Sequence, residues 1–250
     1  MNVEILSITQ EPLKTMYVAA RTCYSHEAPQ EIAKTYSEEK ALKLLKKIID
    51  SGHHSLLEHV NVTFAIDGIS RSIANQLVRH RHCTFSQKST RYCKIKNSAG
   101  SIQGYIDLAE QGNPFLLKDL CSTYFVVDLD NTDLLINYAK QLIKYLELTE
   151  QGVKAEDARE VLPLALKTSL VMTCNLRELV HIANLRLCSR SQYPIRKLVQ
   201  SMVNLTIEKF PFIKPYLVPK CEANGINICT EDKCCHRRPH ISEVNIIEVK

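Results

Sequence analysis

Residues 79–92 read Arg79-His80-Arg81-His82-Cys83-Thr84-Phe85-Ser86-Gln87-Lys88-Ser89-Thr90-Arg91-Tyr92. Fixed positive charges at positions 79, 81, 88 and 91 are interspersed with Ser, Thr and Gln side chains. Guanidinium groups bind phosphate oxygens through paired hydrogen bonds, and hydroxyl and amide groups complete the coordination of such an anion. A solvated helix surface has no need of this mixture. We therefore predict that the run is a loop that binds an anionic ligand.

Residues on both sides of this run extend the pattern. The Arg-His-Arg triplet is followed, after seven further residues, by Ser89 and then by Arg91. The flanking segments are Gly52-His53-His54-Ser55-Leu56-Leu57-Glu58-His59, Gln76, Ala158-Arg159-Glu160-Val161-Leu162-Pro163, Asn175-Leu176-Arg177 and Asn184-Leu185-Arg186. In order and spacing they resemble the flavin-dependent thymidylate synthases over roughly residues 1–215. We expect one enzyme domain over residues 1–217 and a Cys- and His-rich basic tail over 218–250.

Length and composition are compatible with such an enzyme. The chain has 250 residues, 45% of them hydrophobic, which is enough for a full core. No apolar stretch approaches the ~18 residues of a membrane-spanning helix, and the N-terminus does not resemble an export signal. A net charge of +5 does not by itself indicate nucleic-acid binding. We expect a soluble, cytoplasmic protein.

Ten cysteines in a chain of this size, without an export signal, are expected to be mostly reduced. The tail concentrates Cys221, Cys229, Cys234, Cys235 and His236. This density is compatible with a zinc site, but the seven residues between the first two cysteines and the adjacency of the last two differ from common zinc motifs. The expectation is a flexible basic tail and no metal, with a thiophilic metal site as the alternative.

Hydrophobic periodicity predicts helices and strands without internal repeats. Strands are expected at 3–9 and 60–66, and helices at 12–23, 38–49, 69–79, 133–149, 155–162 and 176–188. Residues 94–130 contain several glycines and are expected to form turns and short strands. The resemblance implies an α+β fold of the thymidylate synthase-complementing protein type, with a mixed β-sheet and long helices.

Two of the expected helices carry candidate ligand residues. Gln76 and Arg79 are three residues apart, which places them on one face near the end of a helix over 69–79. In the helix over 176–188, Arg177 and His181 share a face, whereas Arg186 lies nearly opposite Arg177. Such a helix either leaves one face in solvent or contacts two sites. The second alternative predicts an oligomer with composite sites.

The resemblance implies the reductive methylation of dUMP to dTMP, a step of de novo dTMP biosynthesis. The carbon would come from 5,10-methylenetetrahydrofolate and the hydride from FADH2, which NADPH regenerates. All these ligands are anionic, which is compatible with a cationic binding loop at residues 79–92. The resemblance also implies a homotetramer whose active sites are shared between subunits. No membrane or nucleic-acid partner is expected.

The resemblance assigns candidate residues to each ligand. The dUMP site is expected to contain Gln76, Arg79, Gln87, Lys88, Ser89, Arg91, Arg159 and Arg186. The FAD site is expected to contain Ser55, Glu58, Arg79, His80, Arg81, His82, Asn175, Arg177 and His181. The catalytic candidates are Arg186, Ser89 and His53.

Individual roles follow from the same resemblance. Arg91 and Arg159 are expected to bind the phosphate, and Arg186 the uracil edge, where a cation stabilises developing negative charge. His53 is expected where flavin and folate meet. Two positions depart from some family members. Gln87 replaces Glu, so a carboxylate there is not a required base, and Ser55 replaces Thr, which keeps the hydroxyl.

Other chemistries remain alternatives. Ser89 as a nucleophile would need an oriented base, but no carboxylate lies between Arg71 and Tyr105, so we assign Ser89 to binding and polarisation without a covalent intermediate. Cys83 or Cys93 is the candidate nucleophile if the reaction resembles that of folate-only thymidylate synthases.

Two non-enzymatic classes also use basic loops. A nucleic-acid-binding module would need more aromatic residues than Phe85 and Tyr92 provide in this loop. A non-catalytic nucleotide sensor would have no need of His53, Asn175, Arg177 and His181. The presence of both residue sets favours the enzyme.

Overall fold

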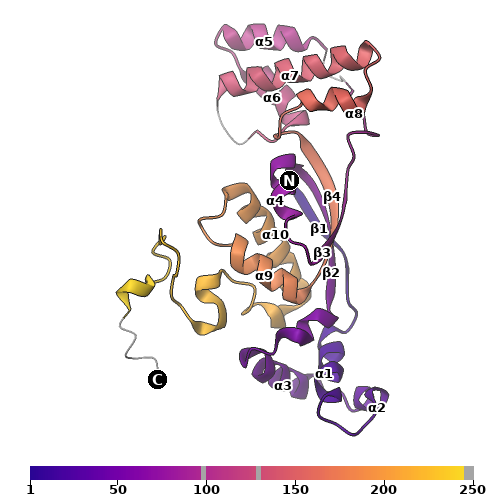
Figure 1. Ribbon diagram of the computed structural model, residues 1–250, viewed down its shortest axis with the longest axis vertical. Helices are drawn as coiled ribbons and strands as arrows, with labels where there is room; N and C mark the ends of the chain where they lie inside the picture. Colours follow the sequence, from indigo (N-terminus) through magenta and orange to yellow (C-terminus); the bar gives the residue numbers. More distant parts are fainter. Residues whose placement is uncertain (97–99, 128–130, 245–250) are drawn as a thin grey trace. The chain divides into compact units, whose positions relative to one another are not determined.

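The computed structural model describes residues 1–96, 100–127 and 131–244 (Figure 1). Its contacts divide the chain into two compact units, each made of separate stretches. The first unit contains Met1–Asn2, Ile66–Arg79 and Ser86–Leu170. The second unit contains Val3–Ala65, His80–Phe85 and the chain from Val171 onward.

Four strands form one sheet in the order β1-β2-β4-β3. They are β1 (Asn2–Ile8), β2 (Asn61–Ser70), β3 (Cys83–Gln87) and β4 (Lys167–Asn175). Where β1 meets β2, Thr9 is paired with Asn61 and Met1 lies beside Gly68. Where β2 meets β4, Thr63 is paired with Thr173 and Asp67 with Ser169. Where β4 meets β3, Lys88 is paired with Ser169 and Cys83 with Cys174. In every pair of neighbours the numbers rise on one strand and fall on the other, so all three pairings are antiparallel.

The α+β class is therefore confirmed, whereas the expected mixed sheet is wrong. Long connections separate β1 from β2 and β3 from β4. Connections of that length can join either parallel or antiparallel strands. The residue pattern therefore did not determine the strand directions.

The first unit is mainly helical. It contains α4 (Arg71–Leu77), α5 (Ile102–Glu110), α6 (Phe115–Tyr124), α7 (Thr132–Glu150), α8 (Ala155–Ala158) and the 3-10 turn η2 (Arg159–Val161). Helices α5, α6 and α7 pack on one another around a core that includes Ile106, Leu117 and Leu142 (Figure 1).

The second unit begins with α1 (Pro12–Thr22), α2 (Pro29–Lys34), α3 (Glu38–Asp50) and the 3-10 helix η1 (His54–His59). It continues with α9 (Leu176–Arg186), α10 (Tyr193–Lys209) and the 3-10 turns η3 (Pro211–Ile213), η4 (Lys220–Gly225) and η5 (Ile241–Glu243). Helix α1 packs on α2, α3 and η1, and α9 packs on η1, η4 and α10. Buried Met16, Leu45, Leu179 and Met202 belong to this core.

The long periodic helices are confirmed at 12–23, 38–49, 133–149 and 176–188, as is the strand at 3–9. The strand expected at 60–66 extends to Ser70, whose Oγ accepts a hydrogen bond from the backbone N of Ile73 at 3.2 Å. This cap starts α4 at Arg71, later than expected, and α4 ends at Leu77. The helix expected at 155–162 divides into α8 and η2.

Two predictions of irregular structure are wrong. The run at 79–92 contains β3, in which inward and outward side chains alternate despite the surrounding charges. Residues 94–130 contain α5 and α6 instead of short strands, while 97–99 and 128–130 lie outside the described residues. Ser101 caps α5 by accepting from the backbone N of Gly104 at 3.2 Å, so this glycine lies inside a helix. The sequence did not indicate α2, β4 or α10.

Candidate functional site

Ser89, Thr90 and Arg91 form a turn directly after β3 in the first unit. The Ser89 hydroxyl accepts a hydrogen bond from the backbone N of Arg91 at 3.2 Å. Arg159, at the start of η2, places Nη1 at 3.5 Å from Thr90 Oγ1. Three of the residues expected to bind dUMP, Ser89, Arg91 and Arg159, are thus joined through one short turn.

Arg91 is held by a carboxylate that the sequence did not single out. Its Nε and Nη2 both lie 2.8 Å from Glu156 Oε2, and Glu156 belongs to α8. The carboxylate occupies the side of the guanidinium that a phosphate would use. A lone Glu in a short acidic helix carries no sequence signal for this role.

Arg71 is a second residue that the sequence did not single out. Its Nη2 donates to the backbone O of Lys88 at 3.1 Å, and its Nε is buried without a hydrogen-bond partner in the described part of the chain. Burial, and then the charge of Arg159, lowers the pKa of Arg71. The guanidinium stays protonated because its ordinary pKa is so high. Two like charges in proximity favour an anion beside them.

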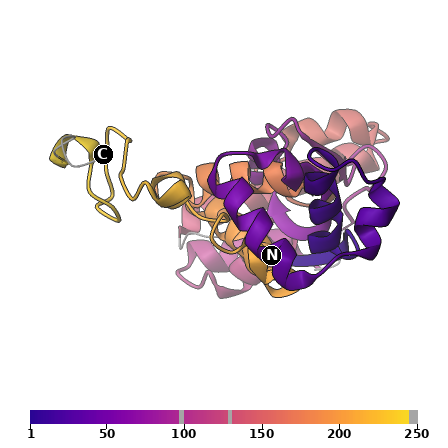
Figure 2. The same cartoon turned by 90° about the horizontal axis from the view of Figure 1, so that it is seen from below.

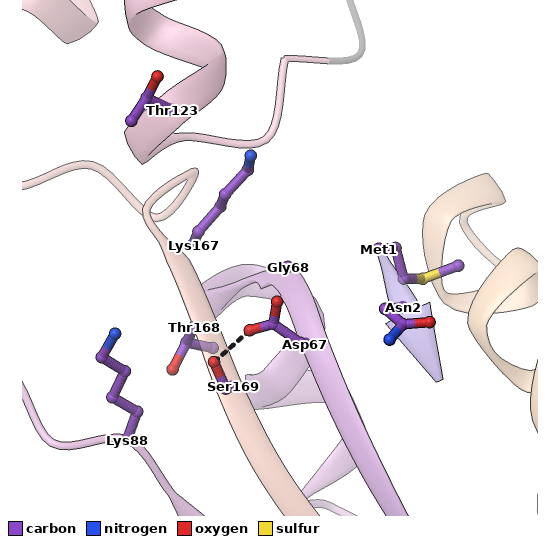
Figure 3. A pocket seen from close by; sticks show the side chains of 9 residues that line it. All are labelled: Met1, Asn2, Asp67, Gly68, Lys88, Thr123, Lys167, Thr168 and Ser169. Atoms are coloured by element: carbon purple, nitrogen blue, oxygen red, sulfur yellow. Dashed lines mark hydrogen bonds between the residues drawn. The ribbon is translucent and has the colours of Figure 1, made fainter. Parts of the chain in front are cut away.

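Gln87 and Lys88 connect this turn to the sheet. Gln87 Nε2 donates to Thr168 Oγ1 on β4 at 3.3 Å. Lys88 lines a cavity of about 420 Å³, together with residues that include Asp67 and Lys167 (Figure 3). None of the other residues expected to bind dUMP lines this cavity.

Gln76 and Arg79 do not share a helical face as expected. Gln76 is half-buried on α4, but α4 ends at Leu77 and the exposed Arg79 lies in the turn beyond it. The earlier end of the helix removes the 3.6-residue geometry on which that expectation depended.

In the second unit, η1 and α9 bring several of the expected flavin residues together. Arg177 Nη1 donates to Glu58 Oε1 between these two elements. Asn175 caps α9, because its Oδ1 accepts from the backbone N of Glu178 at 2.9 Å. Ser55 is exposed on η1, and His53 precedes η1 at its N-cap position.

His80 is the buried centre of a second group in this unit. Its Nε2 accepts a hydrogen bond from Arg186 Nε at 3.1 Å, and its Nδ1 lies 3.6 Å from Glu178 Oε1. The ring meets that of His181 edge to face, with centroids 6.2 Å apart. Arg186, His80 and His181 are thus brought together with Glu178, which the sequence did not single out.

The charge state of His80 follows from these contacts. Burial, then the charge of Arg186 and then that of His181, lowers the pKa of His80 to about 4. The imidazole is therefore neutral near pH 7. Because Nε2 accepts from Arg186, the single ring proton resides on Nδ1 and faces the buried Glu178 carboxylate. The Glu178 carboxylate, the neutral His80 imidazole and the Arg186 guanidinium therefore form one continuous chain of contacts.

Ligand atoms of His80, Glu178 and His181 lie within 4.8 Å of one another, a spacing compatible with a metal ion. The positively charged guanidinium of Arg186 contacts His80 and would repel a metal cation bound to His80, Glu178 and His181.

The remaining expected residues are placed as follows. Arg81 and His82 are exposed in the turn before β3. Of the three catalytic candidates, His53 and Arg186 belong to the second unit and Ser89 to the first. No helix in the described part of the chain is both long enough and apolar enough to cross a bilayer.

Comparisons with known proteins agree with this pattern. The family model described as thymidylate synthase complementing protein matches residues 4–212. A flavin-dependent thymidylate synthase of Clostridium tetani is 35% identical, over 90% of this chain and 89% of its own length. One from Nitratidesulfovibrio vulgaris is 35% identical over 95% of both chains.

A solved structure shows the same fold. It is the flavin-dependent thymidylate synthase ThyX of Helicobacter pylori, complexed with FAD and dUMP. Its TM-score is 0.68 at 24% identity, and the match covers 88% of this chain and 99% of that one. The family model spans most of the chain, and the relatives are alike over nearly all of it. This chain belongs to the flavin-dependent thymidylate synthase family.

Proposed function

We propose that this protein converts dUMP to dTMP as a flavin-dependent thymidylate synthase. Family membership over residues 4–212 is the observation that carries the proposal. In the reaction, 5,10-methylenetetrahydrofolate supplies the one-carbon unit, FAD in its reduced form supplies the hydride, and NADPH reduces the flavin again. The folate leaves as tetrahydrofolate, because the hydride comes from the flavin.

The nucleotide phosphate binds at the turn after β3. Arg91 and Arg159 provide guanidinium groups, and Ser89 and Thr90 provide hydroxyls beside them. On binding, the phosphate replaces the Glu156 carboxylate as the hydrogen-bond partner of Arg91. Its negative charge also offsets the positive charges of Arg71 and Arg159, which lie near each other. Gln76, Arg79, Gln87 and Lys88 complete the proposed dUMP set.

FAD binds along η1 and α9. The ion pair of Glu58 with Arg177 fixes these two elements to each other, and Asn175 sets where α9 begins. The exposed side chains Ser55, Arg81 and His82 are available to its phosphate and ring groups. His80 and His181 complete the flavin set, and His53 is placed where flavin and folate meet.

Arg186 stabilises negative charge on the uracil ring as the ring is activated. The neutral His80 accepts a hydrogen bond from Arg186 Nε, which orients the guanidinium and leaves both terminal NH2 groups for the substrate. A positive charge oriented in advance costs no reorganisation when the transition state forms.

Neither Ser89 nor Cys83 acts as a covalent nucleophile. The Ser89 hydroxyl accepts from the Arg91 backbone, which supports a binding role. Cys83 shares a side-chain hydrogen bond with the buried Cys174, whose pKa this bond and burial raise well above its ordinary value. Cys83 is thus paired with a second thiol, and a thiol does not activate its neighbour as a general base does.

The enzyme acts in the cytoplasm as a homotetramer with shared active sites. Support comes from α9, which presents Arg177 to η1 and Arg186 to His80. A nucleic-acid partner is not part of the proposal.

The test is an omission assay on the purified protein. With FAD, NADPH, methylenetetrahydrofolate and dUMP present, we expect dTMP by chromatography, and omission of any one component should abolish it. UMP in place of dUMP tests the recognition of the sugar. A protein that binds dUMP but forms no dTMP with all components present would contradict the proposal.

A further inference from the structure

Glu178 differs from the other acidic side chains in its burial. Only 7% of its surface is exposed, and it is the one buried carboxylate in the part of the chain that the structure describes. Removal of a carboxylate from water is unfavourable unless its neighbours offset the lost hydration. The contacts of Glu178 therefore indicate what this acid does.

The position of Glu178 in the first turn of α9 explains only part of its environment. Its backbone N donates to Asn175 Oδ1 at 2.9 Å, and the positive end of the helix dipole stabilises a carboxylate in this turn. An acid gains this stabilisation from an exposed position, as Glu38 and Glu39 do in the first turn of α3. The helix terminus does not account for the burial of Glu178.

The Glu178 carboxylate faces His80. Its Oε1 lies 3.6 Å from His80 Nδ1, too far for a hydrogen bond but close enough for its charge to favour a proton on that nitrogen. The other ring nitrogen, Nε2, accepts from Arg186 Nε at 3.1 Å, which a neutral imidazole can do only with its proton on Nδ1. Both contacts favour the same tautomer. They join the purple chain around residue 80 to the orange helix α9 (Figure 2).

The opposite tautomer would disturb Arg186. A proton on Nε2 would make that atom a donor, and it would then face the Nε–H donor of Arg186. A direct ion pair of Glu178 with Arg186 would also be unfavourable for the reaction, because it would offset the charge that the substrate needs. The neutral His80 ring between them avoids both arrangements.

We propose, on the basis of the function proposed above, that Glu178 is a positioning residue for activation of the uracil ring. It holds His80 in the Nδ1–H tautomer, and His80 holds the Arg186 guanidinium in the orientation that stabilises negative charge on the ring. Glu178 acts through His80 and transfers no proton. A guanidinium that is oriented before the reaction needs no reorganisation in the transition state.

Two substitutions of Glu178 test this role. Glu178→Met keeps the length of the side chain but removes the acceptor, and should lower kcat for dTMP formation by about tenfold or more. Glu178→Gln keeps an acceptor oxygen without the charge, and should lower kcat by roughly threefold. Because the interaction matters in the transition state, kcat and kcat/KM should fall by the same factor. Glu208→Met and Glu208→Gln, exposed on α10, are the matched controls and should keep the parental kcat.

The reduction of bound FAD by NADPH, measured without dUMP, separates positioning from damage to the flavin site. Arg186 has no role in this half-reaction, so all variants should reduce FAD at the parental rate. If Glu178→Met does not fold or loses FAD, the nearly isosteric Glu178→Gln carries the test. A parental kcat in Glu178→Gln would then overturn the positioning role.

A double substitution shows whether Glu178 acts through His80. At saturating FAD, His80→Gln and His80→Gln with Glu178→Gln should have the same residual kcat, because the first change already removes the tautomer that Glu178 selects. Additive losses would contradict the positioning role. So would a parental kcat in Glu178→Met, or equal losses in Glu178→Met and Glu178→Gln. These results leave the proposed function intact, whereas parent protein that forms no dTMP would contradict that function itself.

Discussion

The side chain of Arg186 depends on two buried neighbours for its orientation. Glu178 faces Nδ1 of His80, and Nε2 of His80 accepts from Arg186. Because His80 has a pKa of about 4, it stays neutral and keeps Nε2 available as an acceptor at physiological pH. A protonated ring would lose this acceptor and repel the guanidinium.

Replacement of Arg186 tests the role of its charge. We expect Arg186→Ala to lower kcat/KM for dUMP by roughly 10²-fold or more, the usual cost of removing one stabilising donor. Arg186→Lys should restore only part of this, because Lys keeps the charge but lacks the Nε donor to His80. Arg190→Ala, four residues further on and paired with Glu231, is the control and should remain active. Equal activity of Arg186→Ala and the control would refute the role.

Acid should destabilise the protein partly through His80. The unfolded side chain takes up its proton near pH 6.5, whereas folded His80 resists protonation until about pH 4. The unfolded state therefore binds more protons between these values, and stability falls as the pH drops through this window. His80→Gln should lose less unfolding free energy between about pH 7 and about pH 5 than the parent protein in urea titrations. Parallel losses would show that His80 does not contribute.

The candidate site residues that could be predicted from the sequence are those that lie at intervals typical of a known motif. Residues outside such motifs were not predicted. Arg91, Arg159, His80 and Arg186 lie at recognisable intervals. Glu156, Glu178 and Arg71 are single residues whose importance arises from a contact with a distant segment. Only the folded chain brings these partners together.

Among the elements, α9 is determined by its N-cap. Asn175 accepts from the backbone N of Glu178, and this bond fixes where the helix starts and hence where Glu178 and Arg186 lie. The same Asn175 is a proposed flavin ligand. Substitution of Asn175 by Ser can separate the two roles, because Ser also caps helices well but lacks the amide group.

Asn175→Ala should cost about 1 kcal/mol of unfolding free energy through the lost cap. Asn175→Ser should keep most of that stability while it loses the longer amide. If Asn175 binds flavin, both variants should bind FAD more weakly, and the Ser variant should do so without the loss of stability. Chemical unfolding and FAD titration measure the two effects. Unchanged FAD affinity in both would leave Asn175 with the cap alone.

Elements with strong apolar periodicity were predicted from the sequence, and those with conflicting local signals were not. The charges around β3 suggested a loop, although Cys83, Phe85 and Gln87 alternate inward. Glycines suggested turns where α5 forms, yet Ile102, Ile106 and Ala109 face the core of the first unit. Packing outweighed the weak helix preference of Gly104 there.

At the scale of the whole molecule, the proposed tetramer has a measurable mass. Light scattering should give about four times the 28.5 kDa of one chain. If sites are shared, Arg91→Ala and Arg177→Ala chains, each inactive alone, should regain activity when mixed and reassembled. This outcome requires that different subunits supply the two residues to one site. A monomeric mass would contradict the tetramer, and reassembled tetramers without activity would assign both residues to one subunit.

The most direct test of the central claim is the oxidation state of the folate after one anaerobic turnover. Protein with reduced FAD is mixed with dUMP and methylenetetrahydrofolate, and all products are quantified. Hydride transfer from flavin predicts equal amounts of dTMP, tetrahydrofolate and oxidised FAD. Formation of dTMP with dihydrofolate, while the flavin stays reduced, would show that folate supplies the hydride and would contradict the account.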